Sequence, residues 1–168
     1  RLRFHCPPAA IYCRAAVKNF FILKLMKSIE VVAGVIRRKS AEAPSAAVEI
    51  LATQRGYGDY KGGWEFPGGK MEPGESPRQA LARELKEELS VDVRVDDFIC
   101  TVDHDYPDFH ITMHCYYCEV VGGTLTLLEH ESARWLEASE LRSVGWLPAD
   151  ISVVECIECG AGLNTVSK

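Results

Sequence analysis

The sequence predicts an α/β fold in which helices flank a mixed β-sheet. Segments rich in β-branched residues recur along the chain, as strands require. A helical period of apolar residues occurs over residues 77–89, and residues 147–158, with Pro148 near their start, predict a last helix. Strands and helices thus alternate, but without the regular βαβ repeat of a parallel sheet, so the sheet is expected to be mixed.

The first part of the chain predicts strands joined by polar loops. Residues 29–37 (IEVVAGVIR) and 47–55 (AVEILATQR) are predicted strands, and the polar segment 39–46 is a predicted loop between them. The glycine-rich residues 56–63 form a second predicted loop. Residues 64–70 (WEFPGGK) are expected to be a short extended piece that ends in a turn.

The helix over residues 77–89 has a defined start. Ser76 is a favourable N-cap residue, and the fixed φ of Pro77 suits the first helical position. At about 100° per residue, Leu81, Leu85 and Leu89 fall on one stripe. This stripe is the face predicted to pack on the core.

The second half of the chain predicts more strands before a last helix. Gly122 and Gly123 are expected to form a turn between strands. Pro148 suits the first turn of the last helix. In chain order, the predicted elements are long strands at 91–106 and 109–121, a short strand at 133–137, a short helix at 138–144 and a helix at 147–158.

Composition limits the class of protein. The 168 residues, of which 47% are hydrophobic, suit one domain with a sizeable core. No run of about 18 apolar residues occurs, so no membrane span is expected. The net charge of −5 argues against a surface that coats nucleic acid. An anionic substrate would therefore need a cation between itself and the chain.

The two ends of the chain differ from its middle. Residues 1–25 mix Arg, Cys and a Pro pair without any period, and they are expected to be a disordered or spurious extension. A signal peptide fits poorly, because the apolar stretch 19–26 contains Lys24 and no small-residue cleavage site follows it. Residues 26–160 are the predicted domain, and residues 161–168 are expected to be a flexible tail.

The seven cysteines do not predict a disulfide framework. Their number is odd and the chain is not short, so a reducing cytoplasm is the expected location. Two CxxC pairs, Cys115/Cys118 and Cys156/Cys159, raise the alternative of a zinc site. Because Cys115 and Cys118 lie in a predicted strand, they should point to opposite faces of the sheet. Core and surface thiols are therefore the favoured interpretation.

Three glutamates lie together beside the apolar stripe of the predicted helix. Glu84, Glu87 and Glu88 share a side about 100° wide, where each like-charge pair at i,i+4 costs roughly 0.2–0.5 kcal/mol. A solvated acidic face is the simplest interpretation. A carboxylate triplet is also the kind of ligand set that Mg²⁺ prefers, shared with the phosphates of a substrate.

The wider spacing around these glutamates resembles the signature of the Nudix hydrolases. The matching positions are Gly69, Glu75, Arg83-Glu84-Leu85, Glu87-Glu88 and Val91. One position departs from the pattern, since Ser90 stands where the family has a glycine. That glycine would end the helix in a left-handed conformation, which a serine adopts only at some cost.

The resemblance implies an α/β/α sandwich around a mixed sheet, with the loop-helix-loop of residues 69–91 holding metal. It implies hydrolysis of a diphosphate bond in a nucleoside diphosphate linked to another group, with Mg²⁺ or Mn²⁺ as cofactor. Glu75 and Arg83 would brace the loop and the helix as an ion pair. The implied metal ligands are Glu84, Glu87, Glu88, Glu129 and the backbone carbonyl of Gly68, and the implied catalytic residues are Glu84, Glu87 and Glu129, with the general base left open.

The similarity extends over about residues 29–158 to the MutT branch, whose members cleave nucleoside triphosphates to monophosphate and pyrophosphate. Glu129 is the implied late-loop glutamate because it stands six residues before Trp135. His130 and Glu131 are equally plausible in this place, and a solvated loop charge is the simpler interpretation of Glu129. Arg55 would contact phosphate or sugar, unless it is a plain surface arginine. Phe66 would line the base pocket, unless it is plain core.

Asp150 occupies the position where the oxidised-guanine enzymes of this branch carry a base-reading asparagine. An ionised aspartate only accepts hydrogen bonds, so it suits an exocyclic amino group better than a guanine O6. This favours cytidine-type triphosphates without excluding oxidised purines such as 8-oxo-dGTP. The simpler interpretation is an acidic residue favoured by the dipole at a helix N-terminus.

The expected enzyme is thus a cytoplasmic nucleotide-pool hydrolase, a monomer or homodimer, acting on nucleoside triphosphates and not on nucleic-acid polymers or membranes. Another Nudix substrate, such as a dinucleoside polyphosphate, a nucleotide sugar or capped RNA, is one alternative. A non-catalytic Nudix domain that senses a nucleotide is a second. A zinc-binding interaction module is the remaining one.

Overall fold

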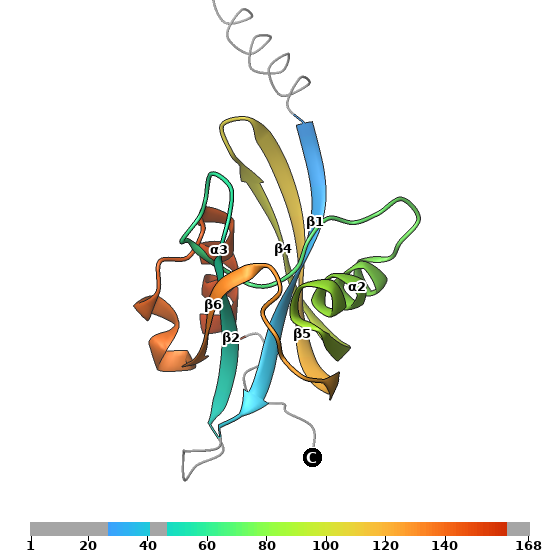
Figure 1. Cartoon of the computed structure of the whole chain (residues 1–168). Helices are drawn as coiled ribbons and strands as arrows, with labels where there is room; N and C mark the ends of the chain where they lie inside the picture. Colours follow the sequence, from blue (N-terminus) through green and yellow to red (C-terminus); the bar gives the residue numbers. More distant parts are fainter. Residues whose placement is uncertain (1–26, 41–46, 161–168) are drawn as a thin grey trace, which may run out of the picture.

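A computed structural model describes residues 27–40 and 47–160 (Figure 1). The expectations for an N-terminal extension over 1–25 and for a tail over 161–168 lie outside these described residues, as does most of the loop expected at 39–46. Over the described ranges, no helix is long and apolar enough to cross a membrane.

Six strands and two α-helices make up the described chain, together with one 3₁₀ helix. In order they are β1 (Lys27–Lys39), β2 (Val48–Arg55), β3 (Trp64–Glu65), α2 (Pro77–Leu89), β4 (Val91–Asp105), β5 (Phe109–Gly123), β6 (His130–Glu137), the 3₁₀ helix η1 (Ala138–Ser143) and α3 (Pro148–Glu158).

The prediction of a mixed sheet is confirmed. The strands follow the order β3-β2-β1-β5-β4, with β6 also paired to β2. β1 and β5 run parallel over ten residue pairs, whereas the other pairings are antiparallel. Helices α2 and α3 cover opposite faces of this sheet (Figure 1), which gives the three-layer arrangement implied by the sequence.

The sheet divides where β1 leaves β2. Ile50 of β2 pairs with Arg37 of β1 and with Leu136 of β6, so these two partners use opposite edges of β2. Further along β2, Thr53 pairs with Glu65 of β3 instead of β1. β1 and β3 therefore occupy the same edge of β2 one after the other, and a fork opens between β1 and β2.

The chain that follows β3 fills one side of this fork. The backbone N–H groups of Val32 and Gly34 in β1 donate to the carbonyls of Gly69 and Pro67, each at 2.9 Å. Residues 67–70 therefore lie directly along β1. The sequence predicted an extended piece at 64–70, and its pairing with β1 brings the start of the Nudix-like segment to the middle of the sheet.

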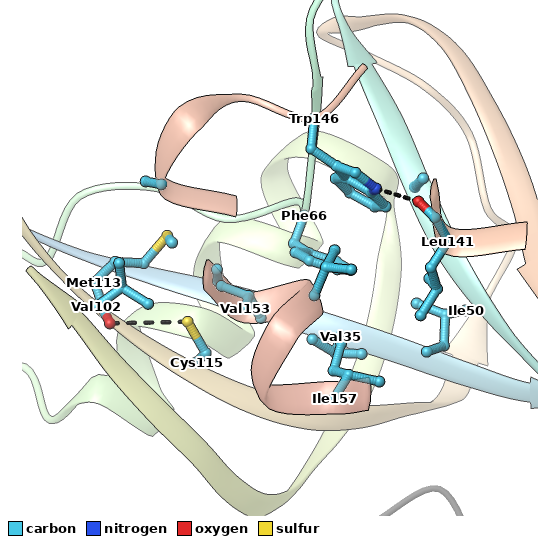
Figure 2. Packing of buried hydrophobic residues seen from close by; sticks show 14 of the residues in the cluster. Val35, Ile50, Phe66, Val102, Met113, Cys115, Leu141, Trp146, Val153 and Ile157 are labelled. Atoms are coloured by element: carbon cyan, nitrogen blue, oxygen red, sulfur yellow. Dashed lines mark hydrogen bonds between the residues drawn. The ribbon is translucent and has the colours of Figure 1, made fainter. Parts of the chain in front are cut away.

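Two apolar cores lie on the two faces of the sheet. The core under α3 contains Phe66, whose ring stacks on Trp146 with centroids 4.5 Å apart (Figure 2). The core under α2 contains the predicted leucine stripe of that helix, all fully buried. Cys115 belongs to the first core and Cys118 to the second, as predicted for strand residues three apart.

One expectation from the sequence was wrong. Gly122 and Gly123 do not form a turn between strands but continue β5, where they pair with Asp92 and Val91 of β4. Gly123 has φ +82°, and a Cβ there would lie 2.4 Å from the carbonyl oxygen of Ser90, so glycine is needed for close approach and not for a hairpin. The short helix expected at 138–144 is confirmed, as a 3₁₀ helix over Ala138–Ser143.

Candidate active site

Helix α2 is held at both ends by hydrogen bonds. Ser76 accepts from the N–H of Gln79, and the Gln79 side chain accepts from the N–H of Ser76 at 3.0 Å, which together form a capping box. At the other end Ser90 adopts φ 58° and ψ 25°, and its N–H donates to the carbonyl of Lys86 at 3.1 Å. The serine thus takes the left-handed conformation that a glycine would supply.

The three predicted metal ligands on α2 have different environments. Glu88 is buried, the Glu84 side chain is 15% exposed, and the Glu87 side chain is 59% exposed. This gradient follows from the helix, because Glu84 and Glu88 lie beside the buried leucines while Glu87 lies one step further around. The acidic side of α2 thus runs from the core out to solvent.

Two glycines allow the loop before α2 to approach this acidic side. A Cβ on Gly68 would lie 2.1 Å from the carbonyl oxygen of Val32, so only glycine fits between β1 and the helix. A Cβ on Gly69 would lie 2.4 Å from Oε2 of Glu84. The backbone N–H of Gly68 also donates to Oε2 of Glu88 at 3.1 Å. The loop and the carboxylates are therefore in direct contact.

Arg83 ties the loop to the helix. Its Nε and Nη2 donate to the two carboxylate oxygens of Glu75 at 2.8 and 2.9 Å, and Nη2 also donates to the carbonyl of Lys70 at 3.1 Å. These charge-assisted bonds lower the pKa of Glu75 to about 2. Arg83 Nη1 further pairs with Glu84 at 2.8 Å and with Glu87 at 3.3 Å. One guanidinium thus contacts three of the carboxylates singled out from the sequence.

Glu88 lacks such a cationic partner. Burial raises its pKa to about 7, and the nearby charges of Glu65 and Glu84 act in the same direction. The hydrogen bond from Gly68 and the charge of His130 oppose this shift without cancelling it. A carboxylate in this position would be stabilised by an added positive charge.

The oxygen donors at this site suit a hard divalent cation in chemistry. Within residues 27–40 and 47–160, however, no three His, Cys, Asp or Glu side chains converge into a group that could hold a metal ion as they stand. The reason is that Arg83 holds Glu84 and Glu87 while Glu88 faces the N–H of Gly68. These side chains would have to turn away from their present partners to share a cation.

A cavity of about 550 Å³ opens beside the acidic side of α2, in the fork between β1 and β2. Its size is that of a pocket for a small ligand. Glu84, Glu88 and Glu129 line one part, and apolar side chains of β1 and β5 line the floor. All three residues that the sequence predicted to bind substrate, Arg55, Phe66 and Asp150, line the same cavity.

Asp150 lies in the first turn of α3 and is buried. Its Oδ1 accepts a hydrogen bond from the backbone N–H of Phe66 at 2.9 Å. Burial is the main cause that raises its pKa to about 8, although the Phe66 hydrogen bond opposes the shift. The raised pKa favours the protonated carboxyl group, which offers an O–H donor as well as acceptors.

Arg55 is not a free surface cation. Its Nη1 pairs with Oε2 of Glu65 at 2.8 Å, and its guanidinium lies over the ring of Tyr57 at 5.1 Å. The other oxygen of Glu65 lies 3.6 Å from Nε2 of His130, whose side chain is only 4% exposed. Glu65 was not predicted as a site residue from the sequence, although it directly precedes the predicted pocket residue Phe66.

Glu129 reaches the cavity from the segment before β6. It is exposed, and its Oε2 accepts a hydrogen bond from the hydroxyl of Tyr57 at 3.0 Å. Tyr57 was not predicted as a site residue either, because it lies in a loop far from Glu129 along the chain. The structure thus brings Glu129 to the same cavity as the α2 glutamates, with Tyr57 as its neighbour.

A glutamate-rich loop-helix-loop against a mixed sheet, next to a ligand-sized cavity, defines a hydrolase of the Nudix type. The sequence pattern of the NUDIX domain matches residues 29–154, and the chain belongs to this family. Nudix hydrolases generally use divalent metal ions.

Curated relatives support the MutT-like branch. The chain is 38% identical to the CTP pyrophosphohydrolase of Escherichia coli over 131 residues, which cover 77% of this chain and 91% of that protein. It is 30% identical to the 8-oxo-dGTP diphosphatase of the same organism over 130 residues, covering 77% and 95%. The solution structure of the E. coli ORF135 protein, 34% identical, superposes with a TM-score of 0.68 and covers 86% of this chain and 99% of that one.

Proposed function

We propose that this chain is a Mg²⁺-dependent nucleoside triphosphate pyrophosphohydrolase of the nucleotide pool, which releases nucleoside monophosphate and pyrophosphate. Mn²⁺ is expected to replace Mg²⁺. The observation that carries the proposal is the shared cavity, because it joins the glutamate side of α2 to the predicted base-binding residues Phe66 and Asp150. A nucleoside triphosphate has two parts that match these two ends: a polyanionic phosphate chain, which a cation would link to the glutamates, and a flat base.

The polyanion belongs at the glutamate end. Glu84, Glu87, Glu88, Glu129 and the carbonyl of Gly68 would hold the cation, which neutralises phosphate oxygens and lowers the pKa of a water molecule. A carboxylate that is not coordinated to the cation during the reaction would take the proton from that water, and Glu84, Glu87 and Glu129 are the candidates. Arg55 would face the phosphate or sugar from the opposite wall of the cavity.

The helix must respond when the cation binds. Glu84 and Glu87 have to leave Arg83, whereas Arg83 keeps its two bonds to Glu75. Arg83 is therefore proposed to hold the loop in place while the ligand carboxylates move. This accounts for an arginine in the middle of an acidic helix face.

For the base, we propose cytidine-type triphosphates as the first class of substrate. The 38% identity with a CTP pyrophosphohydrolase supports this choice. Oxidised dGTP is the second candidate, favoured by the raised pKa of Asp150. A protonated Asp150 can donate to a purine O6 as well as accept from an amino group. The objection to guanine applied to an ionised aspartate, which only accepts hydrogen bonds, and does not apply to the protonated form.

A panel of substrates tests the proposal. Pyrophosphate release would be measured with CTP, dCTP, 5-substituted dCTP, 8-oxo-dGTP and dGTP, with Mg²⁺ and then with EDTA. Glu87→Gln should lose about 100-fold or more in kcat, since it removes a ligand and a candidate base. Glu155→Gln, on the exposed side of α3, is the matched control and should remain active.

The remaining results of the same panel discriminate the alternatives. If dinucleoside polyphosphates, nucleotide sugars or capped RNA are hydrolysed and no triphosphate is, the substrate belongs to one of those classes and not to the nucleoside triphosphates. Nucleotide binding without turnover of anything would leave the sensor alternative.

Two further proposals need separate tests: removal of residues 1–25 should leave activity unchanged, and sedimentation should give a monomer or a homodimer.

A further inference from the structure

Cys100, Cys115 and Cys156 are neighbours between the sheet and the last helix. Cys100 of β4 and Cys115 of β5 are direct partners across the antiparallel pair. Cys156 comes from the end of α3, which packs on β4. Cys100 packs against the core under α3, which contains Cys115, and the thiols of Cys115 and Cys156 are near enough to change its ionisation. None of these three residues lines the cavity, so the candidate active site does not account for the cluster.

The three thiols differ in access. Cys115 is fully buried in the core under α3, and its Sγ faces the carbonyl of Met113 at 3.8 Å (Figure 2). Cys100 and Cys156 are only partly buried. Small oxidants dissolved in water can therefore reach Cys100 and Cys156 but not Cys115.

The thiols also differ in reactivity. The neighbouring thiols of Cys115 and Cys156 hold the pKa of Cys100 below its usual range. The pKa values of Cys115 and Cys156 are raised, by the neighbouring Cys100 and by burial respectively. Because Cys100 is partly exposed and the thiolate is the reactive form, Cys100 is the expected attacking thiol. A thiolate beside a second accessible thiol is typical of a redox-sensitive pair.

We propose that Cys100 and Cys156 are a site of oxidative modification, where a peroxide converts the two thiols into a reversible disulfide between β4 and α3. The Cys100 thiolate attacks a peroxide oxygen, the O–O bond breaks, and a sulfenic acid and hydroxide form. The Cys156 sulfur then attacks the sulfenic sulfur, the S–O bond breaks, and water leaves after taking up the Cys156 proton. The peroxide gains two electrons, and the two thiols lose them.

Peptide mapping of the full-length chain tests this site. The reduced protein would be treated with hydrogen peroxide, alkylated, and digested under non-reducing conditions with chymotrypsin and a glutamyl endopeptidase. Cleavage after Phe109 separates Cys100 from Cys115. Cleavage after Glu158 separates Cys156 from the next cysteine in the chain. The expected product is a cross-linked peptide that contains Cys100 and Cys156 and that dithiothreitol splits into two free thiols.

Three variants make the result specific. Cys100→Ser and Cys156→Ser should each abolish the cross-link. Cys159→Ser, at the exposed C-cap of the same helix, is the matched control and should keep it. A melting curve of each reduced variant shows whether it is folded, so that a missing cross-link is not caused by a disrupted core.

Several results would overturn the proposal. A main cross-link between Cys156 and Cys159, or between Cys100 and Cys115, would place the disulfide elsewhere. So would a main cross-link that involves Cys6 or Cys13. Irreversible oxidation of Cys100 in place of a disulfide would show that Cys156 does not attack the Cys100 sulfenic acid before it is oxidised further.

Discussion

The carboxyl group of Asp150 accepts a hydrogen bond from the backbone N–H of Phe66 at 2.9 Å and is otherwise enclosed by the protein. This bond joins the start of α3 to the loop that leads into the glutamate-bearing helix. One carboxyl oxygen is thus used to fix the backbone of the cavity wall. The carboxyl group as a whole remains costly to ionise, since burial raises its pKa to about 8.

Asp150→Asn should increase stability in alkaline solution. Because its pKa is raised, wild-type Asp150 keeps a proton in the folded chain that the unfolded chain has lost between about pH 4 and 8. Stability therefore falls as pH rises through that window. Asparagine can keep the Phe66 bond and cannot ionise, so the variant should unfold like wild type near pH 4 and be more stable by a few kcal/mol, roughly, at pH 9.

Urea unfolding at both pH values, with EDTA present, measures this difference. Asp92→Asn on the exposed part of β4 is the control and should show no such trend. Equal pH dependence of wild type and Asp150→Asn would contradict the buried, proton-holding aspartate. The same variant addresses base choice. If the protonated form of Asp150 binds substrate, the KM of Asp150→Asn should be close to that of wild type at pH 6.5. The KM of the variant should also not increase when the pH is raised above 8.

Glu88→Gln should separate stability from activity. The pKa of Glu88 is raised to about 7, so without metal its ionisation destabilises the folded chain as pH rises from about 4.5 to 7. Glutamine removes that cost and can still accept the Gly68 hydrogen bond. The variant should melt at a higher temperature than wild type at pH 8 in EDTA, yet lose about 100-fold or more in kcat with Mg²⁺.

Calorimetric melting with and without Mg²⁺ checks this prediction. Wild type should gain melting temperature on adding Mg²⁺, because the ion binds only the folded chain, and the variant should gain less. A variant that is both less stable in EDTA and fully active would contradict the proposed role of Glu88.

Ser90→Gly should stabilise the end of α2. Ser90 is the one residue other than glycine with positive φ in the described part of the chain, at 58°. Glycine adopts this conformation without the steric cost, although it loses more entropy on folding. The net gain should be about 0.5–1 kcal/mol, or a rise of about 1–4 °C in melting temperature. Ser90→Ala is the comparison and should give no gain, and a lower melting temperature for Ser90→Gly would refute the argument.

Tyr57→Phe tests whether Tyr57 positions Glu129. The substitution removes the hydroxyl that donates to Glu129 at 3.0 Å and leaves the ring beneath Arg55. If Glu129 acts on the metal or on water, kcat should fall by about two- to tenfold while KM changes little. Tyr116→Phe, on the α2 side of the sheet, is the matched control. An unchanged kcat for Tyr57→Phe would show that Glu129 needs no such partner.

The start, the apolar face and the end of α2 could be predicted from the local sequence. The helix over 77–89, its Ser76 cap, its buried leucine stripe and the left-handed Ser90 all depend on residues within a few positions of one another. The spacing from Gly69 to Val91 was enough to indicate the Nudix family, since it fixes which groups share one helix face and one loop.

The surroundings of each site residue, in contrast, could not be predicted before the folded structure was known. The fork between β1 and β2, which creates the cavity, depends on pairings between segments far apart in the chain. The same long-range packing buries Asp150 and brings Tyr57 to Glu129. It also places Cys156 near Cys100. Desolvation and partner distance set the protonation of a carboxyl or a thiol, and neither quantity is encoded in the local sequence.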